Sequence, residues 1–173
     1  MIKKTFSIFT VSLLAACGFA YAAAGTADLQ GTTPASATIS GKAVLTDTPE
    51  GLKVTVDLQG VPPGKHGFHI HEGSSCADEG KAAGGHYNPE ETTHGLLSKD
   101  GFEHAHAGDL GNVDISADGT GKVDAVISGL TLTDGKHNVA GRTFILHEKE
   151  DDFGQPTGNA GGRIACGQIK LTE

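Results

Sequence analysis

Six histidines and one aspartate in this sequence have the residue types and the spacing of metal ligands. They are His69, His71, His86, His94, His106, Asp109 and His147. Imidazole nitrogens bind zinc and copper well, and a carboxylate oxygen also binds zinc. Of these two metals only copper can change its oxidation state in a reaction. The sequence therefore predicts a site for two metal ions, one of them suited to redox chemistry.

One subset of these residues lies on predicted strands. His69 and His71 are two positions apart, so both imidazoles point to the same face of their strand. The same spacing also occurs on an ordinary solvated face, and the pair alone does not define a site. His147 ends another predicted strand. We expect it to complete a histidine-rich copper site with the pair from across the sheet.

A second subset lies along a stretch that has no sustained helical or strand period, residues 72–108. Irregular segments of this length are usually functional. The subset consists of His86, His94, His106 and Asp109. Three imidazoles and one carboxylate form the closed ligand shell of a structural zinc ion, and such a site would order the surrounding backbone.

Short strands separated by turns predict an all-β fold. The chain has 26 glycines and no tryptophan, a composition typical of a turn-rich β protein. Residues 52–58 alternate between apolar and polar side chains, as in a half-buried strand. Residues 110–115 and 122–127 flank a turn sequence, and 142–147 and 163–171 look like the last strands. We predict an antiparallel β sandwich or barrel with two elaborated loops.

The N-terminus has the pattern of a secretory signal peptide. Lys3 and Lys4 precede an apolar core at residues 6–16, and small-x-small cleavage patterns end at Ala22 and Ala24. We expect a signal peptide over residues 1–24, a flexible lead-in over 25–34 and the folded domain over 35–173. Export would place the domain outside the cytoplasmic membrane, in the periplasm or cell envelope.

Cys17 leaves two ways of processing open. The sequence Leu-Ala-Ala-Cys at residues 14–17 resembles a bacterial lipoprotein box, which predicts a lipid anchor on Cys17. Ordinary cleavage after Ala22 or Ala24 would instead discard this cysteine. The apolar residues 19–24 favour ordinary cleavage, because a lipoprotein usually has a polar tether there.

The remaining cysteines and the charge bear on compartment and partners. Without Cys17 the chain keeps Cys76 and Cys166, which in an exported domain form either one disulfide or two buried free thiols. The formal net charge is −8, and loss of Lys3 and Lys4 would make it −10 (−8 minus two positive charges). An acidic surface argues against binding to nucleic acid or to anionic lipid.

The motifs around the candidate ligands resemble those of copper-zinc superoxide dismutases, and more particularly the exported bacterial type. The resemblance extends in order and spacing from about residue 35 to the C-terminus. It is carried by GFHIHE at 67–72, GHYNP at 85–89, HAGDLGN at 106–112, GRT at 141–143, HEK at 147–149 and GNAGGRIACG at 158–167. The resemblance implies a Greek-key β sandwich or flattened barrel.

The resemblance also implies a role for each residue. His69, His71, His86 and His147 would bind copper, and His86, His94, His106 and Asp109 would bind zinc. His86 would bridge the two metals and supply a proton to the reaction. Arg163 would attract and orient the superoxide anion beside the copper. Asp151 would link His69 to His94, a disulfide would join Cys76 to Cys166, and His66 would be structural.

Some positions depart from the family pattern. The segment from His147 to Arg163 is shorter than in animal members and lacks their charged insertion, which leaves Lys149 as its main other cation. The segment from His94 to His106 is longer and contains His104, a rival zinc ligand, whereas the motif around Asp109 selects His106. We expect His104 and His137 to be surface residues, and the oligomeric state, monomer or homodimer, stays open.

Three functions are consistent with these features. The first is dismutation of superoxide to dioxygen and hydrogen peroxide by copper that cycles between Cu(II) and Cu(I), with zinc in a structural role. The second is non-catalytic binding of copper and zinc in the envelope. The third, a structural or adhesive β module, does not account for the ligands. The presence of all four copper ligands together with Arg163 favours the enzyme.

Overall fold

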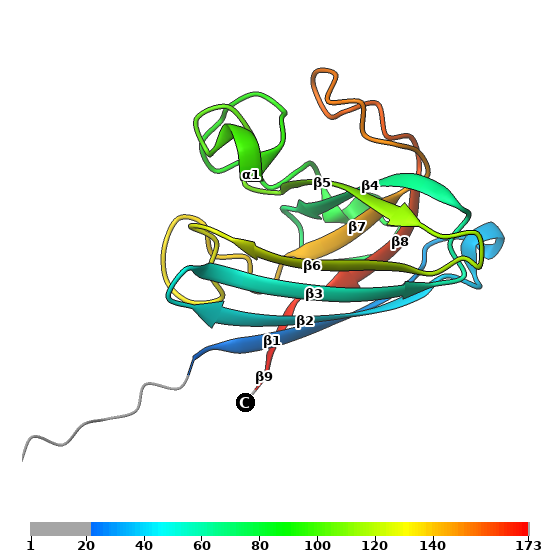
Figure 1. Cartoon of the computed structure of the whole chain (residues 1–173), viewed down its shortest axis with the longest axis horizontal. Coiled ribbons are helices and arrows are strands. Elements are labelled where there is room, and N and C mark those ends of the chain that lie inside the picture. The colour runs from blue at the N-terminus through cyan, green and yellow to red at the C-terminus, as the bar shows by residue number, and fades with distance from the viewer. Residues whose placement is uncertain (1–21, 173) are drawn as a thin grey trace, which may run out of the picture.

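The computed structural model describes residues 22–172, which form an antiparallel β barrel with three short helices (Figure 1). The helices are η1 (Pro34–Ser36), η2 (Lys81–Ala83) and α1 (Leu97–Asp100). None of the helices in this part of the chain is long and apolar enough to span a bilayer. The strands are β1 (Ala24–Gly31), β2 (Ser40–Thr48), β3 (Gly51–Gln59), β4 (Gly64–His71), β5 (Asp109–Ile115), β6 (Gly121–Ile127), β7 (Thr143–His147), β8 (Arg163–Gln168) and β9 (Lys170–Thr172).

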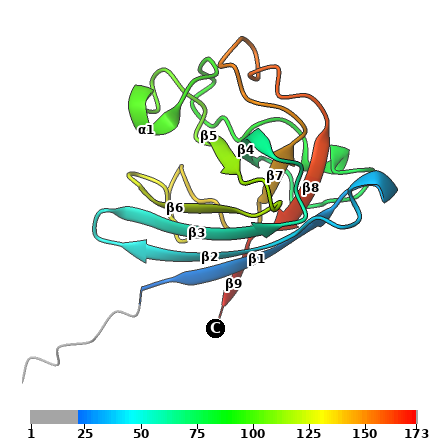
Figure 2. The ribbon, with the colours of Figure 1, turned by 45° about the vertical axis from the view of Figure 1, so that its right-hand side comes forward.

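Eight of these strands close the barrel in a Greek-key order. The order is β1-β2-β3-β6-β5-β4-β7-β8, and β1 pairs with both β2 and β8 to complete the ring. The short β9 pairs with β1 alone. β3 is separated in space from β4, and β6 from β7, so two connections cross from one wall of the barrel to the other (Figure 2). The predicted all-β, antiparallel Greek-key fold is confirmed.

The strands β4 and β7 are buried on both faces, unlike an ordinary barrel strand. On the inner face Phe68 of β4 stacks on Phe144 of β7, with ring centroids 5.0 Å apart, at the centre of the apolar core. The outer face of both strands is covered by loops, so that His69, His71 and His147 are also buried. The outer face of these two strands therefore provides an enclosed, polar surface.

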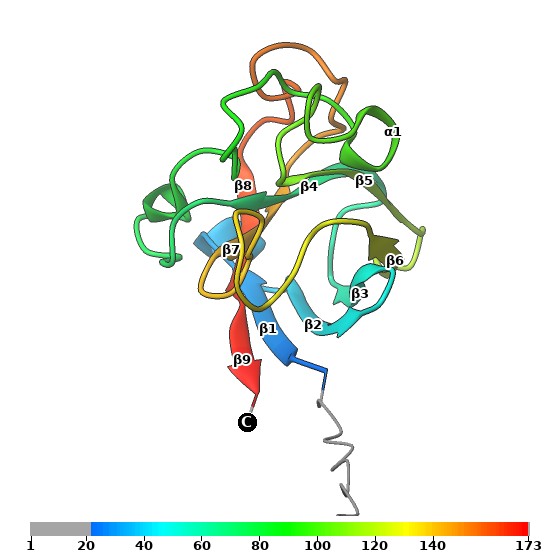
Figure 3. The same ribbon diagram turned by 90° about the vertical axis from the view of Figure 1, so that its left-hand side faces the viewer.

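Two long connections provide this cover. The β4–β5 connection, residues 72–108, and the β7–β8 connection, residues 148–162, lie together at one side of the barrel (Figures 1 and 3). Both are largely irregular, as the lack of periodicity predicts. The N-terminal end of β1 and the short β9 lie at the opposite side. All candidate ligands thus come from one side of the molecule.

The predicted flexible lead-in over residues 25–34 is wrong. Residues 25–31 belong to β1, which pairs with β2 over seven residues from Ala24 to Gln30. The inward positions include Gly25 and Ala27, which are too small to produce a visible apolar alternation in the sequence. Most of the predicted signal peptide lies outside the described residues, and of its last three residues Ala24 already belongs to β1.

Cys76 and Cys166 form a disulfide that joins the β4–β5 loop to β8. The two cysteines are 90 positions apart in the sequence, and their Cα atoms are 5.7 Å apart. Together with Ala83 and Ile145 they form a small apolar cluster on the outer face of the barrel, separate from the main core. The disulfide therefore fixes the part of the loop that covers this outer face.

Replacement of both cysteines by alanine is expected to lower the free energy of unfolding by about 2–5 kcal/mol, because the unfolded chain loses a cross-link that closes a long loop. Guanidinium unfolding of the metal-free variant and of the metal-free parent measures this loss. The reduced parent protein serves as the control and should unfold near the midpoint of the variant. Equal midpoints for all three samples would contradict a stabilising role for the disulfide.

Candidate metal centre

Strand register brings the predicted ligands together from distant parts of the sequence. His69 of β4 lies opposite Asp109 of β5, next to a register shift in that pair of strands. His71, at the end of β4, forms an isolated bridge with His86 of the loop. His147, the last residue of β7, lies opposite Arg163, the first residue of β8. The centre therefore lies where the ends of β4, β5, β7 and β8 meet.

Four buried residues form a first group of ligand atoms around Asp109, called here the Asp109 group. Oδ1 of Asp109 lies 2.7 Å from Nδ1 of His86 and 3.1 Å from Nδ1 of His106. Oδ2 lies 2.9 Å from Nδ1 of His94. Oδ2 also accepts hydrogen bonds from the backbone N–H groups of Gly95 and His106. The group consists of His86, His94, His106 and Asp109.

A second group of buried residues consists only of histidines and is called here the His147 group. Nε2 of His71 lies 3.3 Å from Nε2 of His147. Nδ1 of His71 donates to the carbonyl of Gly84 at 3.0 Å, so Nε2 is the nitrogen that faces the rest of the group. The rings of His69 and His86 have centroids 4.2 Å apart. The members are His69, His71, His86 and His147, so His86 belongs to both groups.

Burial sets the protonation of His71, His86 and His147. Burial, together with the smaller effect of neighbouring charged groups, lowers the pKa of His71 to about 2 and that of His147 to about 3. Burial also lowers the pKa of His86 to about 4, although Asp109 opposes this shift. These imidazoles are therefore neutral at neutral pH, which is the form that binds a metal.

Two carboxylates, Asp109 and Asp151, have the opposite effect on the pKa of His94. Burial disfavours the charged form of His94, but Asp109 and Asp151 outweigh burial and raise its pKa to about 9. Burial would likewise raise the pKa of Asp109, yet the hydrogen bonds from the surrounding imidazoles hold this pKa far below the usual range. The carboxylate of Asp109 therefore stays ionised and provides a negative charge that suits a divalent cation.

Two buried ring nitrogens without hydrogen-bond partners in residues 22–172 indicate that these groups fit metal ions. Nδ1 of His69 and Nδ1 of His94 are buried and make no hydrogen bond with the described residues, although the second lies 2.9 Å from Asp109. A buried polar atom without a hydrogen bond is costly unless something else satisfies it. Nδ1 of His69 belongs to the His147 group and Nδ1 of His94 to the Asp109 group. A metal ion in each group would therefore satisfy both nitrogens.

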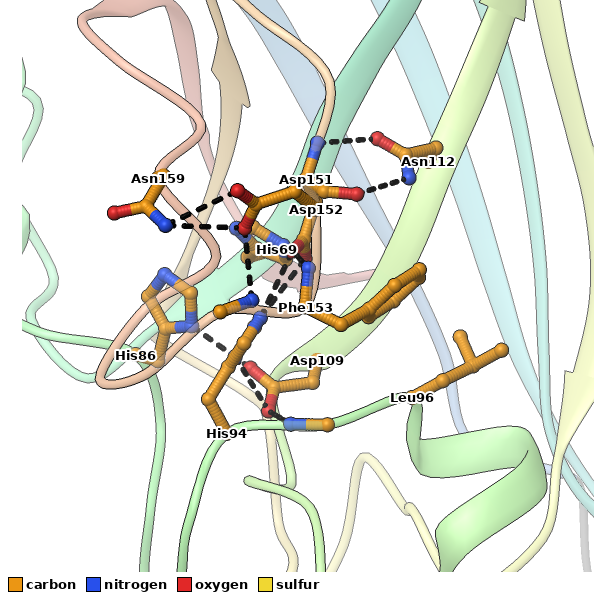
Figure 4. Close-up of polar contacts among 12 residues, drawn as sticks. His69, His86, His94, Leu96, Asp109, Asn112, Asp151, Asp152, Phe153 and Asn159 are labelled. Carbon is orange, nitrogen blue, oxygen red and sulfur yellow. Dashed lines mark hydrogen bonds and ion pairs between the residues drawn. The ribbon is translucent and has the colours of Figure 1, made fainter.

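Asp151 links the two groups through the ring nitrogens of His69 and His94 that face away from the ligand sites. Nε2 of His69 donates to Oδ2 of Asp151 at 2.8 Å, and Nε2 of His94 contacts both carboxylate oxygens at 3.0 and 3.1 Å (Figure 4). These bonds turn the opposite nitrogen, Nδ1, of each ring towards its ligand group. Outer partners of this kind orient metal ligands and raise their basicity. The predicted link between His69 and His94 through Asp151 is present.

Arg163 lies beside the His147 group. Its guanidinium donates to the carbonyls of Gly80 and Gly84, each at 2.6 Å. The same Gly84 carbonyl accepts the hydrogen bond from His71. Arg163 is half-buried, and burial lowers its pKa from the usual arginine value. The disulfide at Cys76 and Cys166 anchors the loop that bears these carbonyls, so the guanidinium position depends on it.

The other histidines lie outside both groups. His66 is buried and its ring nitrogens contact the carbonyls of Pro62 and His147 at 2.8 Å each, a structural role as the resemblance implies. His104 is exposed and belongs to neither group, so the local fold selects His106. His137 pairs with Glu90 at 2.7 Å and stacks on Phe102. It is thus partly buried between loops rather than free on the surface.

Two residues that support the centre were missed in the sequence. The side-chain amide of Asn112 on β5 bonds both backbone groups of Asp151, at 2.7 and 2.9 Å, and so fixes the carboxylate (Figure 4). Gly158 has a φ of 79°, and a Cβ atom there would lie 1.9 Å from Oδ1 of Asp151. Both lie inside the quoted motifs, but only the folded backbone reveals their partners.

A closed Greek-key barrel with two histidine-rich groups that share one imidazole defines a two-metal protein. The model of the family described as copper/zinc superoxide dismutase (SODC) matches residues 39–169, and the chain belongs to this family. The His147 group is its copper site, the Asp109 group is its zinc site, and His86 is the shared ligand.

Two known proteins show the same relationship. The chain is 40% identical over 129 residues to an extracellular superoxide dismutase [Cu-Zn] of Caenorhabditis elegans. That match covers 70% of this chain but only 57% of the length of the relative. A crystal structure of the clock protein EA4 superposes with a TM-score of 0.78 at 36% identity and covers 90% of this chain and 98% of the other.

His106 and His104 offer a matched pair of substitutions. Replacement of His106 by alanine removes a zinc-site ligand, and we expect zinc affinity to fall by more than the roughly 10–100-fold typical of losing an outer partner. Replacement of His104 by alanine should leave zinc binding unchanged. Competition with a chromogenic zinc chelator measures both affinities. Equal losses in the two variants would contradict the ligand assignment.

Proposed function

We propose that this protein converts superoxide to dioxygen and hydrogen peroxide. The supporting observation is the copper site itself, four buried histidines with Arg163 beside them. Copper bound there would take one electron from one superoxide anion and give one electron to a second. Two superoxide anions and two protons thus become one dioxygen and one hydrogen peroxide. Zinc does not change oxidation state and would keep His86 and the loops in place.

Two residues of the chain, Arg163 and His86, would bind the anion and supply a proton. Arg163 would bind and orient the anion, since a fixed cation in a half-buried position attracts a small anion more strongly than an exposed one. His86 faces Asp109 through Nδ1, so its Nε2 is the nitrogen on the copper side. That nitrogen can hold a proton and transfer it to the reduced product. A protein that only stored copper would have no need of Arg163.

We further propose that the protein is of the bacterial exported type and works in the periplasm or cell envelope. The apolar leader, the small-x-small patterns and the disulfide support export. The relative from Caenorhabditis elegans is named as extracellular. Mass spectrometry of the mature N-terminus tests the two processing routes, because an acylated Cys17 and a start after Ala22 or Ala24 differ in mass.

Stopped-flow measurement of superoxide decay tests the activity. The mature protein loaded with copper and zinc should accelerate the decay strongly, and the same protein loaded with zinc alone should not, because zinc supplies no electron transfer. Copper content is determined on the same samples. Full copper occupancy without acceleration would contradict the catalytic proposal and would leave non-catalytic metal binding.

Replacement of Arg163 by glutamine tests its proposed role. We expect the second-order rate constant for superoxide to fall by roughly tenfold or more, since local positive potential raises association rates by about 10–10³-fold. Lys53 is an exposed cation on β3, and its replacement by glutamine changes the net charge equally. This control should keep the parent rate. A similar fall in both variants would indicate an effect of net charge alone and would contradict a local role for Arg163.

A further inference from the structure

The zinc ligand His94 lies in a stretch that provides little backbone support of its own. Residues 91–96 have no regular secondary structure. Three successive backbone N–H groups in this stretch donate to side-chain oxygens instead of to the backbone carbonyls of a neighbouring strand. The acceptors for residues 94, 95 and 96 are Gln155, Asp109 and Asp100. Side chains from elsewhere therefore decide where the backbone of His94 lies.

Gln155 holds both backbone groups of His94 with one side chain. The N–H of His94 donates to Oε1 of Gln155 at 3.1 Å, and Nε2 of Gln155 donates to the carbonyl of His94 at 2.8 Å. Two such bonds fix both the position and the orientation of one residue, as a neighbouring strand would. Asn112 holds Asp151 in the same way. The pattern recurs at two residues of the same centre.

The same segment also holds the His94 ring. Asp151, four residues before Gln155, accepts the hydrogen bond from Nε2 of His94. Between them Phe153 lies with its ring nearly parallel to the imidazole, at an angle of 19° and a centroid distance of 6.4 Å (Figure 4). Phe153 has a φ of 59°, a conformation that is rare for an aromatic residue. Residues 151–155 thus contact both the ring and the backbone of His94.

We infer that Gln155 is a positioning residue of the zinc site, which acts through the backbone of His94 to aim Nδ1 at the metal. It does not touch the metal itself. The role goes beyond the family ligands and the Asp151 link, because an amide in the β7–β8 loop sets the position of a ligand in the β4–β5 loop. The inference depends on the zinc site and is independent of the proposed activity.

The test compares zinc and copper release from protein loaded with both metals. Replacement of Gln155 by alanine is expected to increase zinc release to a chromogenic chelator by about 10–100-fold, the usual effect of losing an outer partner, with copper retention unchanged. Gln155 is exposed, so the apolar core is untouched. Gln59 is an exposed glutamine on β3, and its replacement by alanine is the matched control.

Two further readouts separate positioning from a general loosening of the loops. Gln155→Glu keeps the acceptor for the His94 N–H but loses the donor, and it should release zinc at an intermediate rate. Cobalt(II) in the zinc site should show altered visible absorption bands in Gln155→Ala and parent-like bands in Gln59→Ala. Parent-like zinc release and cobalt bands in Gln155→Ala would overturn the inference. Equal acceleration of zinc and copper release would overturn it as well.

Discussion

Two buried carboxylates determine which way the imidazole rings of the metal centre face. Asp109 is 0% exposed and Asp151 is 1% exposed. An unpaired carboxylate at such a position would cost several kcal/mol, so each is held in place by the histidines and backbone amides that contact it. His94 lies between the two, with one ring nitrogen towards each. The carboxylates therefore fix the ring orientation on which both metal sites depend.

The barrel can bury these carboxylates and ligands because β4 and β7 are covered on both faces. Their inner residues, such as Phe68 and Phe144, supply the apolar core, and their outer residues supply ligands. The outer face can be enclosed only by the two long loops, which have little regular structure of their own. The loops in turn are held by the disulfide, by Asp151 and by side-chain amides. Ligand geometry and loop structure are therefore established together.

The sequence predicted the ligands better than it predicted their supports. His69 and His71 share a face because of strand geometry. The motifs quoted above contain His86, His106, Asp109 and His147, whereas His94 lies between two motifs and was assigned from the overall resemblance. β1 was missed because Gly25 and Ala27 face the interior, where small residues give no hydrophobic signal. Gln155 could not be recognised because its two bonds cross 61 positions of the sequence, and an amide side chain has no pattern that indicates its partner.

The most direct test of this account is a crystal structure of the protein loaded with copper and zinc, with anomalous data collected at both absorption edges. Copper is expected among His69, His71, His86 and His147, and zinc among His86, His94, His106 and Asp109. The ring of His86 should lie between the two metals, with Nδ1 on the zinc side. A single metal peak, or a ring of His86 that contacts only one metal, would contradict the shared centre.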